Sequence, residues 1–136
     1  FIEKGKEGRF LRIPVYGNTK LALLLFTREL SDRLKNTGIT VNAADPGIVS
    51  TSMIRMNKWF DWLTDIFYRP FIKTPEEGAS TAIYLALSKE VEGKSGCCFA
   101  DGKEKKIAAR ICLPVLQTKL WNETELWFAK KNIRLD

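Results

Sequence analysis

A tyrosine and a lysine four residues apart are the residues of this chain best suited to acid–base chemistry. In Tyr16-Gly17-Asn18-Thr19-Lys20, a helical backbone would place the phenol and the ammonium on one face, about one turn apart. A phenol is a poor proton carrier at neutral pH, but a neighbouring cation stabilises a phenolate and lowers a phenol's pKa. We therefore predict that Tyr16 exchanges a proton with a substrate and that Lys20 tunes it.

The spacing alone leaves a plain structural alternative open. Tyr16 could be a half-buried tyrosine at a helix start, with the stem of Lys20 lying along the surface. The sequence has no histidine, which excludes Ser-His-Asp hydrolysis and HExxH zinc sites within these residues. Cys97, Cys98 and Cys112 are odd in number and two are adjacent, which suits neither a disulfide framework nor a metal site. We predict packing roles for them, no metal, and a reducing cytoplasmic location.

Composition is that of an ordinary folded protein. The 136 residues are 45% hydrophobic and 28% charged, which fits a single domain. The net charge of +6 lies in short clusters such as Lys103-Glu104-Lys105-Lys106, so we predict a solvated surface and no nucleic-acid binding. The longest apolar run, residues 21–26, is too short to span a membrane.

The elements around the Tyr-Lys pair predict a helix followed by a strand. Residues 1–15 read as a surface loop, with Pro14 barring helix continuation upstream. Residues 16–36 have helical spacing and leucines nearly all round, so this helix should be covered by a sheet and other helices, and Gly38 should cap it. Residues 39–44 predict a buried parallel strand, which Asp45-Pro46-Gly47 ends.

Three further elements are expected beyond this corner. Thr74-Pro75-Glu76-Glu77 is a capping-box start for a helix running to about Leu87. Residues 96–100 predict a second short strand, and residues 113–131 an amphipathic helix with Pro114 in its first turn. The resulting class is α/β, with about two strands and several helices.

The order of these features resembles the short-chain dehydrogenase/reductase family. Tyr16 to Thr51 is similar to its retinol dehydrogenase-like branch, and Gly93-Lys94-Ser95-Gly96 with Phe99-Ala100-Asp101 continues the likeness over roughly residues 10–110. The resemblance implies the C-terminal portion of a doubly wound, Rossmann-type parallel sheet. It also implies an NAD(P)-dependent oxidoreductase that interconverts a carbonyl and an alcohol by hydride transfer, with NAD or NADP as cofactor.

The resemblance also assigns roles to particular residues. Tyr16 would be the general acid/base, and Lys20 would both tune it and hydrogen-bond the nicotinamide ribose. The turn would let the backbone approach the nicotinamide closely, because glycine has no side chain. Its cofactor-binding residues would be Pro46, Gly47, Ile48, Val49 and Thr51. Taken alone, Pro46-Gly47 would be a plain turn.

The family's glycine-rich phosphate loop and catalytic serine should precede Tyr16, and neither occurs in residues 1–15. With no initiator Met, we interpret residues 1–136 as the C-terminal half of a single short-chain dehydrogenase/reductase domain, incomplete for turnover without the nucleotide-binding half. Two strands would leave sheet edges unpaired, so we expect a longer protein or a homo-oligomer in which a second copy completes the sheet.

The aromatic segment 53–71 has two open interpretations. It occupies the place of the family's variable substrate loop, where its aromatic residues would contact an apolar aldehyde, ketone or alcohol. The same aromatics beside Arg55, Lys58 and Arg69 would equally suit contact with a membrane surface or a protein partner. The alternative function is therefore a non-catalytic interaction module that uses this segment.

Overall fold

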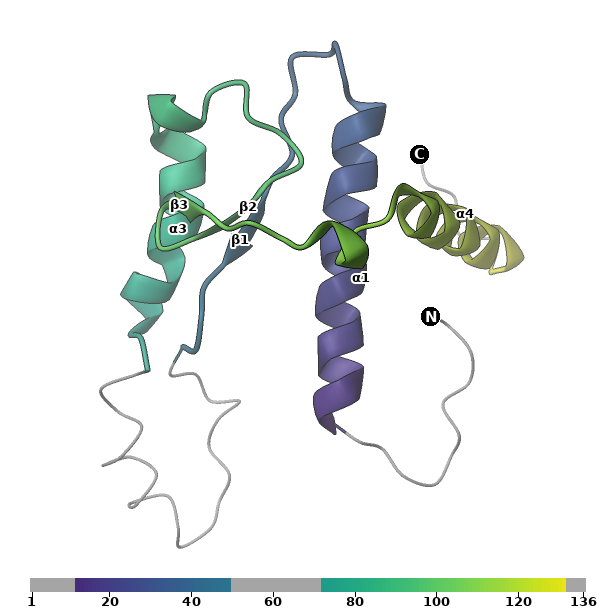
Figure 1. Cartoon of the computed structure of the whole chain (residues 1–136), viewed down its shortest axis with the longest axis horizontal. Helices are drawn as coiled ribbons and strands as arrows, with labels where there is room; N and C mark the ends of the chain where they lie inside the picture. The colour runs from purple at the N-terminus through teal and green to yellow at the C-terminus, as the bar shows by residue number, and fades with distance from the viewer. Residues whose placement is uncertain (1–11, 50–71, 132–136) are drawn as a thin grey trace, which may run out of the picture. The chain divides into compact units, whose positions relative to one another are not determined.

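The computed structural model describes residues 12–49 and 72–131 (Figure 1). These residues belong to two compact units, each of which is described by itself. The first comprises Phe1–Ala43, Gly93–Cys97 and Lys106–Asp136, and the second comprises Ala44–Glu92 and Cys98–Lys105. The first unit carries Tyr16 and Lys20, and the second carries the Asp45-Pro46-Gly47 corner.

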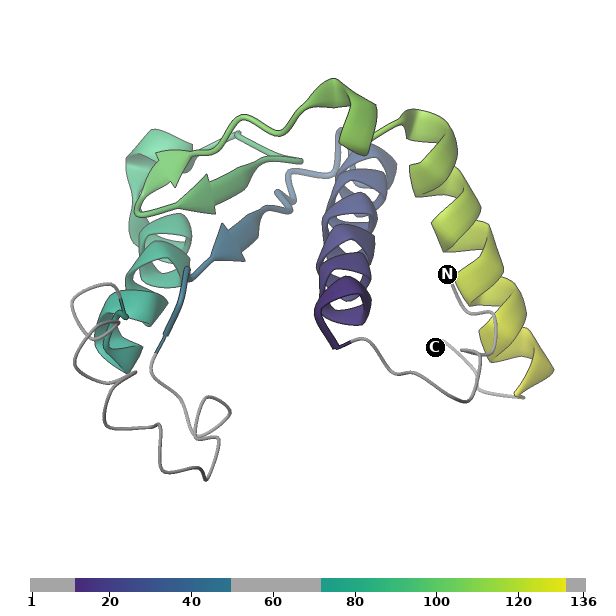
Figure 2. The same cartoon turned by 60° about the horizontal axis from the view of Figure 1, so that its bottom comes forward.

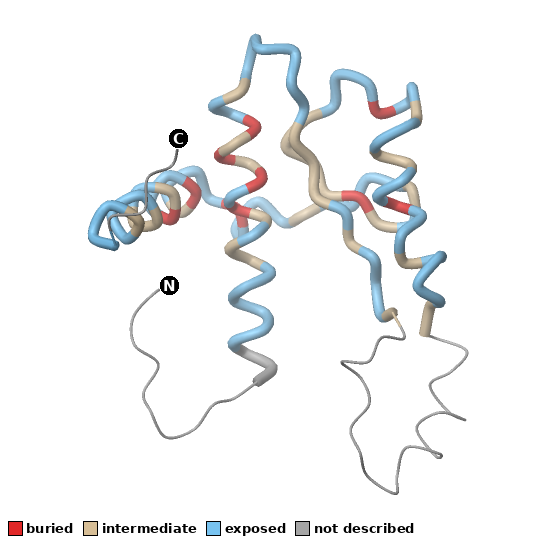
Figure 3. Tube along the Cα trace, turned by 180° about the vertical axis from the view of Figure 1, so that it is seen from behind, coloured by how far each residue is buried: buried red, intermediate tan, exposed pale blue. Residues whose placement is uncertain are grey.

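Two helices form the core of the first unit. The long helix α1, Arg12–Arg33, packs against α4, Pro114–Lys130, which follows the short helix η4, Ala109–Ile111. Their shared core is Leu25, Cys112 and Leu120, which are 0%, 4% and 8% exposed. Figure 3 shows the buried positions gathered in the C-terminal half of α1 and along α4. The expected helix over residues 113–131 is confirmed, with Leu113 preceding its first turn.

Polar and aromatic contacts also join α1 to α4. The Trp121 ring is stacked on Phe26 with 5.6 Å between centroids, and the Arg33 guanidinium lies 4.3 Å from the Trp121 centroid. Nearby, the Glu29 carboxylate accepts hydrogen bonds from Arg33 Nε at 2.9 Å and Thr118 Oγ1 at 3.2 Å. Because each oxygen of the nearly buried Glu29 has its own donor, its charge is compensated where water is scarce.

Both ends of α1 differ from the sequence prediction. The helix begins at Arg12, so Pro14 does not bar it and residues 12–15 are not a loop. The physical reason is that N–H groups of the first helical turn have no intrahelical acceptor, so proline costs no hydrogen bond there. The helix ends at Arg33, and Asn36 adopts a positive φ of 68° before Gly38 reaches 79°.

The expectation that α1 is covered on several sides is wrong. Leu23 and Phe26 remain 56% and 43% exposed, and residues 15–20 are all exposed. Apolar composition therefore predicted that α1 packs against other elements, but not that it does so through one narrow face. The exposed first turns are those that carry Tyr16 and Lys20.

The segment leading to the first strand is held by side chains. Ser95 Oγ accepts from Val41 N at 2.9 Å and lies 2.8 Å from Ser31 Oγ. Asn42 Nδ2 donates to the Lys94 carbonyl at 2.7 Å, and Cys97 N donates to Asn42 Oδ1 at 3.1 Å. Because side chains take up these donors and acceptors, regular strand geometry begins only at Ala43, and the strand predicted over residues 39–44 is displaced.

The second unit contains a three-stranded sheet, apart from the strand residue Ala43, together with the helix α3, Pro75–Leu87, and a short helix after it. The strands are β1, Ala43–Asp45, β2, Cys98–Ala100, and β3, Lys103–Glu104, in the order β1-β2-β3. Figure 2 shows β2 and β3 as a hairpin, and their pairing is antiparallel. The α/β class is confirmed, with one strand more than expected. The predicted burial of the first strand is wrong, because Ala44 is exposed.

The extra strand follows from a tight turn at Asp101-Gly102. These residues have φ values of 52° and 68°, and an Asp-Gly pair is strongly favoured where both central residues of a hairpin turn need positive φ. Phe99, 1% exposed, anchors the hairpin, with its ring centroid 6.4 Å from that of Tyr84 on the helix α3. The hairpin therefore has a fixed position against α3.

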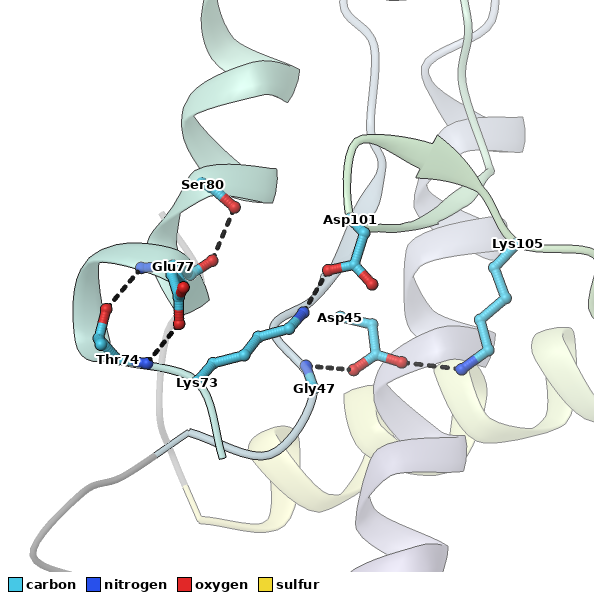
Figure 4. Close-up of polar contacts among 8 residues, drawn as sticks. All are labelled: Asp45, Gly47, Lys73, Thr74, Glu77, Ser80, Asp101 and Lys105. Carbon is cyan, nitrogen blue, oxygen red and sulfur yellow. Dashed lines mark hydrogen bonds and ion pairs between the residues drawn. The ribbon is translucent and has the colours of Figure 1, made fainter. Parts of the chain in front are cut away.

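The helix α3, Pro75–Leu87, begins as predicted, and a short helix η3, Lys89–Val91, follows it. Thr74 Oγ1 accepts from Glu77 N at 3.2 Å, and Glu77 Oε2 accepts from Thr74 N at 2.8 Å. This reciprocal pair is the capping box, which Figure 4 shows beside the corner after β1. It fixes where the chain enters α3, directly after Lys73.

Gly78 lets α3 approach the corner closely. A Cβ at this position would lie 2.6 Å from Val49 Cγ2. A Cβ at Gly17 in α1, in contrast, would meet nothing within 4 Å.

We therefore expect Gly17→Ala to stabilise the protein by about 0.5–1 kcal/mol through helix propensity, and Gly78→Ala to destabilise it by at least about 1 kcal/mol through overpacking. Urea unfolding of both variants checks this; equal and positive effects would contradict the close approach.

Candidate active site

The first part of the site is the Tyr16-Lys20 pair on α1. Lys20 Nζ lies 5.2 Å from the centroid of the Tyr16 ring, so the ammonium lies over the ring within cation–π range. The Tyr16 side chain is 60% exposed, and Lys20 is exposed as well. The predicted shared face of the two side chains is therefore present, and both are open to a ligand.

Tyr84 provides a contrast within the described residues. Its hydroxyl donates to Glu90 Oε2 at 2.8 Å, and this bond to a carboxylate raises the pKa of Tyr84 above its ordinary value. A phenol tied to an anion is a poor proton donor to a substrate, whereas Tyr16 has an ammonium as its neighbour. Of these two tyrosines, Tyr16 is the one with a cation over its ring.

The second part of the site is the corner after β1, shown in Figure 4. Asp45 Oδ1 accepts from Gly47 N at 3.0 Å, and Asp45 Oδ2 accepts from Lys105 Nζ at 2.9 Å. Gly47 adopts a φ of 70°, a backbone conformation that residues with a side chain rarely adopt. The Asp45 carboxylate thus stabilises the turn through the Gly47 N–H, and Lys105 at the end of the β2–β3 hairpin fixes the position of the carboxylate.

A second cation lies beside the same turn. Lys73 Nζ would be 3.2 Å from a Cβ at Gly47, and it pairs with the Asp101 carboxylate at the hairpin tip. The main chains of the two segments are also joined. Lys73 N donates to the Ile48 carbonyl at 2.8 Å, and Val49 and Lys73 form an isolated parallel β-bridge. The corner and the residues preceding α3 are therefore tied by main chain and side chain.

The charges around the corner perturb one another. The Lys105 ammonium, through its hydrogen bond, lowers the pKa of the Asp45 carboxyl, and the Gly47 N–H acts in the same direction. Reciprocally, the Asp45 carboxylate raises the pKa of Lys105. The pair is consequently fully ionised at neutral pH.

This shift predicts a pH-dependent effect of Asp45→Asn. Because the folded-state pKa is depressed, Asp45 contributes stability above its ordinary value of 3.8 and loses it as pH falls through the lowered value. The side chain is 37% exposed, so we expect the variant to lose only about 0.5 kcal/mol at pH 7. Thermal unfolding at pH 7 and at steps below 3.8 measures this; a difference that grows as the pH falls would contradict the assignment.

Each of these two parts, taken by itself, presents exposed groups. Gly47 carries no side chain and a Cβ there would crowd Lys73, while the next residue, Ile48, is 63% exposed. The space beside Gly47 that a side chain would take is therefore filled by the end of Lys73, and Ile48 is the exposed side chain of the turn. The exposed Tyr16 hydroxyl and Lys20 ammonium are both groups that can donate hydrogen bonds.

The predicted site residues are divided between the two units: Tyr16 and Lys20 belong to the first, and Pro46, Gly47, Ile48 and Val49 belong to the second. Thr51 and the aromatic segment 53–71 lie outside the described residues. In the parts of the chain that are described, no three histidine, cysteine or acidic side chains gather as a metal site. Within the same parts, no helix has the length and apolarity needed to traverse a bilayer.

Sequence reasoning missed the four charged residues that surround the corner: Asp45, Lys73, Asp101 and Lys105. Lys105 was interpreted as part of an ordinary surface cluster. One available signal was Asp101-Gly102, a hairpin dipeptide that folds the following lysines back toward β1. No local pattern pointed to Lys73, because its partner lies 28 residues away.

Comparison with known proteins supports the family suggested by the sequence. The family model described as short chain dehydrogenase matches residues 4–60. Human retinol dehydrogenase 14 is 44% identical over 129 residues, covering 93% of this chain and 38% of that protein. Human retinol dehydrogenase 12 is 38% identical over 122 residues, covering 90% of the chain and 38% of that protein. Zebrafish (Danio rerio) polyprenol dehydrogenase is 40% identical over 118 residues, covering 80% and 35%.

These matches confirm the predicted resemblance of the chain to short-chain dehydrogenases. More particularly, its relatives are of the retinol dehydrogenase type, a group of oxidoreductases. The chain spans only about 38% of the length of the first of these relatives. No solved structure matches it.

Proposed function

We propose that the protein carrying this chain is an NAD(P)-dependent oxidoreductase that interconverts an apolar alcohol and its carbonyl compound. The observation that carries the proposal is the Tyr16-Lys20 pair, exposed on one face of α1 with Lys20 Nζ 5.2 Å from the Tyr16 ring centroid. The family supports it, because short-chain dehydrogenases use NAD or NADP.

Tyr16 would act as the general acid/base. In reduction its hydroxyl donates a proton to the carbonyl oxygen, and in oxidation its oxygen removes the proton from the alcohol. The bound dinucleotide would supply or accept the hydride. The Lys20 ammonium stabilises the negative charge that the phenol oxygen gains when the proton leaves, and it hydrogen-bonds the ribose.

The corner after β1 would receive the nicotinamide end of the dinucleotide. Pro46, Gly47, Ile48 and Val49 offer main chain to the ring, and Thr51 is proposed to contact the carboxamide or pyrophosphate. Residues 1–136 are thus proposed to be the C-terminal, catalytic half of one dehydrogenase domain. Contact of the protein with a membrane surface and pairing with a second copy belong to the same proposal.

The substrate class is inferred from the relatives. Their names specify retinol and polyprenol, which are long apolar alcohols. An alcohol of that kind, or the corresponding aldehyde, is our proposed substrate. Choice between NAD and NADP is left to experiment.

The test is a hydride-transfer assay with the full-length protein. Oxidation of NADH or NADPH is followed with retinaldehyde and with a small hydrophilic aldehyde as the matched control. We expect turnover with the apolar aldehyde at a much higher kcat/KM than with the control. Binding to lipid vesicles without any turnover or dinucleotide binding would instead favour the non-catalytic interaction module.

A further inference from the structure

Two ion pairs join the β2–β3 hairpin to the two chain segments at the corner. Asp45, which precedes Pro46-Gly47, pairs with Lys105 at the end of the hairpin. Lys73, which precedes α3, pairs with Asp101 at the hairpin tip. The hairpin thus supplies one cation and one anion. The cation pairs with the segment before Pro46-Gly47, and the anion pairs with the segment before α3 (Figure 4).

Both pairs act on the conformation of Gly47. The Asp45 carboxylate has two oxygens, one bonded to Gly47 N and the other to Lys105 Nζ, so the lysine fixes the rotamer from which the first oxygen reaches the turn. Lys73 Nζ occupies the space beside Gly47 that a side chain would take, and Asp101 holds it there. Without these partners, the turn would have fewer constraints on its left-handed conformation.

The exposure of these side chains argues against a purely structural role. Asp45 and Lys105 are 37% and 53% exposed, and in the other pair Asp101 is 67% exposed and Lys73 28%. Ion pairs at this exposure contribute little to folding stability. Their common feature is their target, because both act on the same glycine of the corner.

We propose that Asp45, Lys105, Lys73 and Asp101 form a charged clamp, two ion pairs that hold the Pro46-Gly47 corner in the shape that receives the nicotinamide end of the dinucleotide. They are positioning residues and not ligands. The inference rests on the proposed function for the identity of the bound group, whereas the constraint on Gly47 is a property of this chain alone.

The first arm of the test needs no ligand. Amide hydrogen exchange at Gly47 is measured in the full-length protein for the wild type, Asp45→Ala and Lys105→Met. Loss of the acceptor should speed exchange about tenfold in Asp45→Ala, and loss of the lysine should speed it about two- to fivefold. The control is Lys103→Met, two residues from Lys105, which should not change it. Equal exchange in all four proteins would overturn the clamp.

The second arm measures the dissociation constants of NADH and NADPH by fluorescence titration. Asp101→Asn and Lys105→Met should each weaken binding about two- to fivefold, with KM for the dinucleotide rising more than kcat falls. Combining Lys73→Met with Asp101→Asn, which tolerates the positive φ of position 101, should weaken binding no more than the stronger single change, because either change already breaks the pair. Losses that simply multiply in the double variant would refute the pairing.

The two arms separate the two proposals. Wild-type protein that binds neither dinucleotide would contradict the proposed function, even if exchange at Gly47 responds as expected. Normal dinucleotide binding that none of the clamp variants alters would contradict the positioning role alone. Unfolding temperatures of all variants, which should remain close to that of the wild type, show that any loss is local.

Discussion

The Tyr16→Phe variant of the full-length protein is expected to turn over about 10²- to 10⁴-fold more slowly than the wild type, the usual contribution of a positioned acid or base. The change removes one hydroxyl from a side chain that is 60% exposed, so packing and folding should be unaffected. Dinucleotide affinity should change little, because the proposed ribose contact belongs to Lys20. Steady-state kinetics with the apolar aldehyde give the result directly.

The matched control is Tyr84→Phe. Tyr84 lies in the second unit, and its hydroxyl is bound to Glu90. We expect this variant to keep near wild-type turnover, since its phenol has no part in the proposed proton transfer. Full activity in Tyr16→Phe, with or without a loss in Tyr84→Phe, would remove Tyr16 from the mechanism.

The largest stability effect is expected for Leu25→Ala. Leu25 is 0% exposed in the core between α1 and α4, and truncating such a leucine costs about 2–5 kcal/mol through lost burial and the cavity left behind. Leu23 on the same helix is 56% exposed, so Leu23→Ala should cost less than about 1 kcal/mol. Denaturant unfolding of the pair measures the difference. Similar losses for the two leucines would mean that α1 is packed differently.

The elements that local patterns define were predicted well. The capping box at Thr74 and the proline-started helix after Leu113 each depend on residues within one turn, so the sequence contains their whole cause. The Tyr-Lys pair belongs to the same class, because a spacing of four on a helix fixes the shared face. These features needed no knowledge of distant partners.

The features that were missed depend on partners far apart in the chain. Ser95 and Asn42 take up hydrogen bonds of the segment before β1, so the strand begins four residues later than predicted and ends one residue later. The clamp joins Asp45 to Lys105, 60 positions away, and no local sequence pattern predicts such a pair. The early start of α1 had a local cause, the tolerance of a first helical turn for Pro14, which could have been recognised.

The central claim is that Tyr16 and Lys20 work as one unit, and a double-mutant cycle tests it most directly. Turnover at saturating dinucleotide is measured for Tyr16→Phe, for Lys20→Met and for the double variant. If Lys20 acts through the Tyr16 oxygen, the double variant should be about as slow as Tyr16→Phe alone, because the group that the ammonium supports is already gone. Two effects that simply multiply would show that the residues act independently, and would contradict the account.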